Sequence, residues 1–168
     1  EDLVYSSDTM CIALSRIPWI LMNLAGGLIV AWLVDKFTGS LEQAIILAAF
    51  MPLVNGMGGN VAIQISTVTT RGFAIGHIRA DNLRKNVMKE ISVGVLMGLI
   101  CGGTVSIVAS AWKGNPYLGV VVGLAMSTAV GWASVLGATV PVVFRSLGAD
   151  PAIAAGPIVT TMCDMSGI

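Results

Sequence analysis

The chain has 168 residues, of which 55% are hydrophobic and only 11% are charged, and its formal net charge is zero. A soluble domain usually carries about 25% charged residues, so this composition excludes a surface that faces water on all sides. The zero net charge gives no electrostatic reason to expect a nucleic-acid partner. Apolar stretches long enough to cross a bilayer recur along the sequence, which predicts an all-α integral membrane protein embedded in a lipid bilayer.

Five membrane-spanning helices are predicted in chain order. The first covers residues 17–34, and the next three cover residues 41–72, 87–112 and 117–144. The fifth begins after Asp150 and Pro151 and meets the end of the chain at Ile168. A helix over residues 151–168 extends about 27 Å, barely enough to cross a hydrocarbon core of about 30 Å. The fifth helix is therefore expected to be truncated.

Basic residues are divided unevenly between the two sides of this arrangement. The N-terminal flank and the loops after the second and fourth spans share one side, which the positive-inside rule assigns to the cytoplasm. The expected protein is a multi-pass protein of the plasma or inner membrane, with a cytoplasmic N-terminus and an external C-terminus. The cytoplasmic side carries Arg16, Arg71, Arg79, Arg84, Lys85, Lys89 and Arg145, and the other side carries Lys36 and Lys113.

Cysteine and histidine give no sign of a metal centre. Cys11, Cys101 and Cys163 are far apart and form no CxxC motif, so they are interpreted as small apolar residues of helices. His77 is the one histidine and falls in a polar loop, where it cannot build a zinc site alone.

Of the nine acidic residues, only Asp164 lies deep inside a predicted span, because Glu42 and Glu90 lie near the ends of theirs. A carboxylate at that depth costs about 2.5–3.5 kcal/mol on insertion scales, and no Lys or Arg lies in a span interior to pair with it. The carboxyl group is therefore either protonated or in contact with water and a cation. An intramembrane aspartyl protease would need a second aspartate sharing the proton, so an enzyme is not expected.

The second span contains MPLVNGMGGNVAIQISTVTTRG over residues 51–72, which is rich in glycine and carboxamides. Proline and glycine at membrane depth make backbone carbonyls available to a cation's water shell. Close helix packing through small residues is the alternative interpretation, but it leaves the amides of Asn60 and Gln64 without partners. Helical periodicity groups Pro52, Gly56, Asn60, Ile63 and Thr67 on one face, with Gln64 at its edge.

The fifth span has a similar face. If the two faces meet, they line a water-filled path whose ligands are all oxygen atoms, which suits hard cations such as Mg²⁺ or Ca²⁺. One carboxylate per chain is few for a divalent ion, so a C2 homodimer with the pore on its axis is expected. This second face carries Pro157, Thr160, Thr161, Asp164 and Gly167.

Two blocks of residues resemble the MgtE magnesium channel and transporter family and its solute-carrier relatives, over essentially the whole chain. This resemblance implies that Asp164 holds hydrated Mg²⁺ at the dimer axis, and that Gly56, Gly59, Asn60 and the backbone around Thr160 help to line the pore. The first block is Pro52, Gly56, Gly58, Gly59, Asn60, Gln64, Ser66, Thr67, Arg71 and Gly72; the second is Gly148, Asp150, Pro151, Ala152, Pro157, Thr161, Asp164 and Gly167.

The sequence departs from the family pattern at two positions. The family often has asparagine where this chain has Ile63 and Gly156, and these changes leave Mn²⁺, Ca²⁺ and Co²⁺ open beside Mg²⁺. Bacterial members also carry cytoplasmic N-terminal and CBS domains, whereas this chain has only a short tail over residues 1–16. Residues 1–168 are therefore expected to form one transmembrane domain, with any cytoplasmic regulatory domain removed or separate.

The predicted function is a channel that conducts hydrated Mg²⁺ through a pore lined by the second and fifth helices. The alternative is a cation/proton or Na⁺-coupled exchanger in which Asp164 is the titrating carrier. The expected metal contacts are Asp164, Asn60, Gly56, Gly59 and Thr160, and the expected pore walls are Pro52, Ile63, Gln64, Thr67, Pro157, Thr161 and Gly167.

Overall fold

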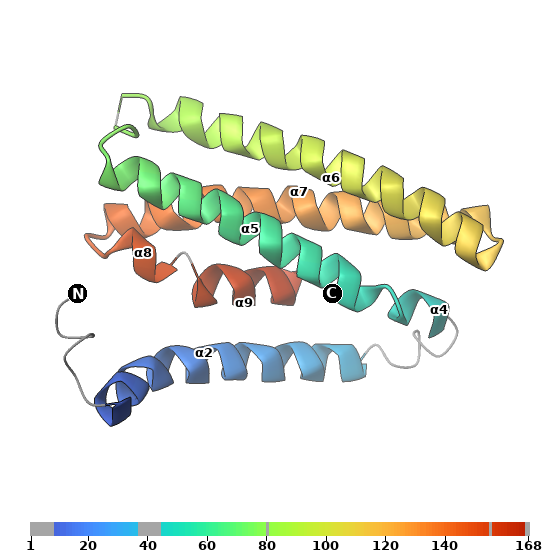
Figure 1. Ribbon diagram of the computed structural model, residues 1–168, viewed down its shortest axis with the longest axis horizontal. Coiled ribbons are helices and arrows are strands. Elements are labelled where there is room, and N and C mark those ends of the chain that lie inside the picture. Colours follow the sequence, from blue (N-terminus) through green and yellow to red (C-terminus); the bar gives the residue numbers. More distant parts are fainter. Residues whose placement is uncertain (1–8, 37–44, 80, 155, 167–168) are drawn as a thin grey trace.

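The computed structural model describes residues 9–36, 45–79, 81–154 and 156–166 (Figure 1). Within these ranges every regular element is a helix, which confirms the all-α prediction. The helices are α2 (Thr9–Lys36), α4 (Ile45–Ala48), α5 (Met51–Ala74), α6 (Leu83–Lys113), α7 (Pro116–Ser146), α8 (Pro151–Ala154) and α9 (Pro157–Ser166).

The third and fourth predicted spans are confirmed as long continuous helices. Helices α6 and α7 are the two elements of the described chain that are long and apolar enough to cross a membrane. The first predicted span lies within α2, whose shorter apolar stretch runs from Ile20 to Trp32. The total of five crossings stays a prediction.

The second predicted span is not one continuous helix, so that prediction was wrong at residues 49–50. A turn there separates α4 from α5, and the backbone N–H of Phe50 donates to the carbonyl oxygen of Leu47 at 2.9 Å. Pro52 stands in the first turn of α5, where its missing N–H costs no helical hydrogen bond. The start of this span, residues 41–44, lies outside the described residues.

The fifth predicted span is likewise divided, into α8 and α9. Pro157 opens α9, and the N–H of Thr160 makes the first helical bond to the carbonyl oxygen of Gly156 at 3.1 Å. Pro157 has no N–H to donate to a preceding turn, and α9 begins at this residue.

Helix α7 is the centre of the arrangement. Helices α5, α6, α8 and α9 all contact it, while α2 packs on the far side of α9. Helices α2, α6 and α9 run in one direction, and α5 and α7 run in the opposite direction (Figure 1). The short α9 therefore lies antiparallel to α5 in the layer between α7 and α2.

Glycine and serine allow α6 and α7 to approach closely. A Cβ atom on Gly98 would lie 2.9 Å from the carbonyl oxygen of Ser127, and one on Gly102 would lie 2.5 Å from that of Gly123. The hydroxyl of Ser127 donates across the interface to the carbonyl oxygen of Gly98 at 3.1 Å. Small residues and interhelical hydrogen bonds are the usual sources of helix association in lipid. Helices α6 and α7 therefore form a closely packed helical hairpin.

Helix α5 also packs on α7, and the contact is equally close. A Cβ atom on Gly137 would lie 2.6 Å from the carbonyl oxygen of Ala62. Apolar side chains of α9 complete this layer, because Val159 and Cys163 are buried in the same cluster as Ala62. Helices α5 and α9 are thus both fixed against α7.

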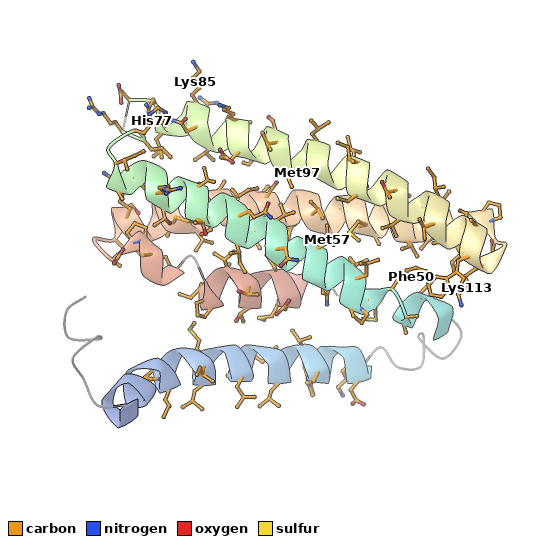
Figure 2. All side chains as sticks on the ribbon, viewed as in Figure 1. Phe50, Met57, His77, Lys85, Met97 and Lys113 are labelled. Carbon is orange, nitrogen blue, oxygen red and sulfur yellow. The ribbon has the colours of Figure 1, made fainter. Side chains whose placement is uncertain are left out.

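The basic residues of the described chain gather at the two ends of the bundle. Figure 2 shows nitrogen-bearing side chains around His77 and Lys85 at one end, with Lys113 at the other. Lys36 lies in the last turn of α2, at the same end as Lys113. The ends therefore differ in charge as the sequence predicts, while the assignment of the basic end to the cytoplasm stays a prediction.

Candidate functional site

A polar stripe is exposed along α5. The opposite side of the helix is buried against α7 and its neighbours, mainly through apolar residues such as Val54, Val61 and Ile65. A helix face in contact only with lipid is expected to be apolar, because polar groups are costly in hydrocarbon. The exposed stripe contains the six residues predicted to share one face, Pro52, Gly56, Asn60, Ile63, Gln64 and Thr67, and Leu53 and Val68 are exposed at its edges.

Helix α9 presents its polar residues beside α5. Val159 and Cys163 are buried on the α7 side, which turns Thr160 toward α5. A Cβ atom on Gly59 would lie 3.7 Å from the methyl carbon of Thr160, so Gly59 marks the contact between the two helices. Asp164 follows one turn after Thr160 and is half-buried. Because the helices are antiparallel (Figure 1), Asp164 lies level with the turn of α5 before Gly59.

The two glycines predicted to contact the ion occupy different environments. Gly56 is exposed, and a Cβ atom there would have nothing within 4 Å. Gly59 is buried at the contact with Thr160. Gly56 is therefore open on the stripe, whereas Gly59 provides the room that α9 needs.

The threonine hydroxyls of α9 bond within their own helix. Thr160 donates to the carbonyl oxygen of Gly156 at 2.7 Å, and Thr161 donates to that of Pro157 at 2.8 Å. The methyl group of Thr161 faces α2, where a Cβ atom on Gly26 would collide with it. Thr161 thus lies at the α2–α9 contact, Pro157 is half-buried at the start of α9, and Gly167 lies outside the described residues.

Asn55 is a polar residue of this region that sequence reasoning missed. It precedes Gly59 by one turn, on the same side of α5, and so lies at the level of Asp164. Its Oδ1 atom is buried and has no hydrogen-bond partner. A buried amide acceptor without a partner costs free energy. Burial distinguishes Asn55 from other polar residues of α5, and the sequence alone does not give it.

The donor set of the region consists of oxygen atoms. Among the residues that the structure describes, no three His, Cys, Asp or Glu side chains come together as a metal cluster. One carboxylate, amides, hydroxyls and backbone carbonyls are ligands for a hard cation that keeps much of its water.

Comparison with known proteins agrees with this chemistry. The family model for MgtE, described as a divalent cation transporter, matches residues 51–168. The magnesium transporter MgtE of Bacillus subtilis is 31% identical over 165 residues, which cover 98% of this chain and 37% of that protein. The MgtE of Enterococcus faecalis is 32% identical over 97% of this chain and 36% of its own length.

A third relative gives the same result. The magnesium transporter MgtE of Thermus thermophilus is 33% identical over 171 residues, which cover 99% of this chain and 37% of that protein. The chain thus spans little more than a third of these relatives' length. All three are named as transporters, which supports the expectation that the chain is not an enzyme. The chain belongs to the MgtE family of divalent cation transporters.

Proposed function

We propose that two copies of this chain form a channel that conducts hydrated Mg²⁺ along a path lined by α5 and α9. The observation that carries this proposal is the exposed stripe of α5, where Asn60, Gln64 and Thr67 point away from the apolar core. In a membrane these groups need water or a partner. A water-filled path along the stripe satisfies them, and the relatives are magnesium transporters by name.

Asp164 supplies the negative charge of the proposed path. Electrostatic attraction to a carboxylate is twice as strong for a divalent as for a monovalent cation at the same distance. In a C2 homodimer two copies of Asp164 and two of Asn60 surround one axis, so the ion meets two charges. Mg²⁺ gives up its water reluctantly, and amide and hydroxyl groups such as those of Asn60 and Thr67 contact its bound waters.

The proposed channel is tested by Mg²⁺ flux into liposomes that enclose a fluorescent indicator. We expect influx down a Mg²⁺ gradient alone, with no need for a proton or Na⁺ gradient. Flux that appears only with such a gradient, and that saturates, would contradict the channel and favour a coupled exchanger.

Replacing Asn60 with leucine is expected to lower Mg²⁺ flux by about 30-fold, because one hydrogen bond of about 1 kcal/mol to the ion's water shell is lost from each of the two copies. Thermal stability should stay unchanged, since the side chain is exposed. The flux assay checks this, with Thr104→Leu as control, because Thr104 is an exposed polar residue of α6 outside the proposed path. Equal losses in both variants would count against the role of Asn60.

Replacing Asn55 with leucine is expected to reduce Mg²⁺ flux while leaving thermal stability equal or higher. Its buried Oδ1 has no partner, so removal relieves an unsatisfied group, worth about 1–3 kcal/mol. Mg²⁺ flux in Asn55→Leu falls only if Oδ1 of Asn55 contacts the passing ion or its water shell. Ser66→Ala is the matched control, because Ser66 also carries a buried oxygen without a partner on α5. Unchanged flux in Asn55→Leu would make Asn55 a buried amide without a transport role.

A further inference from the structure

A cleft of about 360 Å³ lies between the end of α5 and the start of α6. Arg71 and Lys89 bring two permanent positive charges to it, and Glu90 brings one negative charge. His77 and Asn86 add further polar groups to the wall. Figure 2 shows this end of the bundle, with the labelled His77 in the connection between the two helices. The cleft begins beyond Thr67 and shares only Val68 with the edge of the stripe of α5.

The loop that forms one wall of the cleft is held in place by its own hydrogen bonds. The N–H of Ile78 donates to the carbonyl oxygen of Gly72 at 3.0 Å. The side-chain amide of Asn82 donates to the carbonyl oxygen of His77 at 2.9 Å, and its Oδ1 accepts from the N–H of Arg79 at 2.8 Å. Ile78 is buried against Gly72. The cleft is therefore preformed and needs little ordering when a ligand binds.

Apolar surface continues from the charged cleft. Val68 and Ile75 both line it and are 53% and 72% exposed. The cleft also lies where α6, a helix long enough to cross a membrane, begins. A ligand that fills this place has an anionic head for Arg71 and Lys89 and an apolar part for the exposed side chains. An inorganic anion matches only the first of these features.

We propose that this cleft binds the headgroup of an anionic phospholipid from the adjacent leaflet. The guanidinium of Arg71 suits bidentate contact with a phosphodiester, and Lys89 adds a point charge. Glu90 repels a doubly charged free phosphate but accepts a hydrogen bond from a headgroup hydroxyl. A phosphodiester with a hydroxylated headgroup, as in phosphatidylglycerol, therefore fits the charges of the cleft.

The proposal is tested by native mass spectrometry of the purified protein titrated with phosphatidylglycerol or phosphatidylcholine. The test variant is Arg71→Gln with Lys89→Gln. The matched control is Arg84→Gln with Lys85→Gln, which removes two exposed charges from the same end of the bundle but not from the cleft. Size-exclusion chromatography verifies that both variants are folded.

We expect the wild type to prefer phosphatidylglycerol, with affinity at least about tenfold lower in the cleft variant and little changed in the control, since each basic residue near an anionic surface contributes several-fold. Inorganic phosphate at millimolar concentration should not displace the lipid. Equal retention of both lipids, or equal losses in the two variants, would overturn the site. Displacement by phosphate would overturn the lipid as its ligand.

Discussion

Replacing Asp164 with alanine is expected to reduce Mg²⁺ flux in liposomes by at least about 100-fold. The variant removes both carboxylates from the proposed homodimeric path, and the attraction of a charge pair at a few ångströms amounts to several kcal/mol near a protein surface. Asp164→Asn keeps the side chain's size and one oxygen acceptor. We expect it to retain weak flux that no longer distinguishes divalent from monovalent cations.

Asp81→Asn serves as the control for this loss of charge. Asp81 is exposed in the connection before α6, away from α9. The Mg²⁺ flux of Asp81→Asn should therefore match that of the wild type. If Asp164→Ala conducts Mg²⁺ at the wild-type rate, Asp164 does not line the ion path. Flux in the wild type that is steeply pH-dependent and coupled to another gradient would instead identify Asp164 as a titrating carrier.

Replacing Gly137 with alanine is expected to destabilise the protein by about 1–3 kcal/mol, the usual cost of overpacking a close contact. The new Cβ would lie 2.6 Å from the carbonyl oxygen of Ala62 and 3.1 Å from its Cα. Both atoms belong to the backbone of α5 and cannot rotate away, so α5 must move off α7. Thermal unfolding in detergent, followed by circular dichroism, measures the change.

Gly103→Ala is the matched control for the α5–α7 contact. A Cβ atom on Gly103 would have nothing within 4 Å, and alanine favours a helix over glycine by about 0.5–1 kcal/mol. This variant should be as stable as the wild type or slightly more so. If both glycine variants lose the same stability, the close contact of α5 with α7 is not what the substitution disrupts.

The two long helices were predictable from the sequence because each is a single apolar run with clear end signals. Asn115 accepts hydrogen bonds from the N–H groups of Tyr117 and Leu118, Pro116 opens α7, and Gly114 ends α6 in the left-handed conformation. Local chemistry of this kind determines helix ends without help from tertiary structure.

The second and fifth spans were predicted less well because proline has more than one possible role. Pro52 was interpreted as a residue that frees a backbone carbonyl within a continuous helix, but Pro52 and Pro157 each stand at the start of a shorter one. Both roles follow from the missing N–H. Which one applies depends on whether the preceding residues continue the helix, and the sequence pattern does not decide this.

The exposed face of α5 was predictable, whereas the partners of α9 were not. Helical periodicity alone places Gly56, Asn60 and Thr67 on one side. The contact of Thr161 with Gly26 on α2 depends on how a distant helix packs. The orphaned oxygen of Asn55 likewise becomes visible only once burial is known.

Isothermal titration of the purified protein with Mg²⁺, beside Asp164→Ala, tests the central claim most directly. If the cation contacts the carboxylate of Asp164, the wild type binds Mg²⁺ saturably and the variant does not bind it. Equal binding by the two proteins would contradict the claim, because the ion would then be held somewhere other than at Asp164.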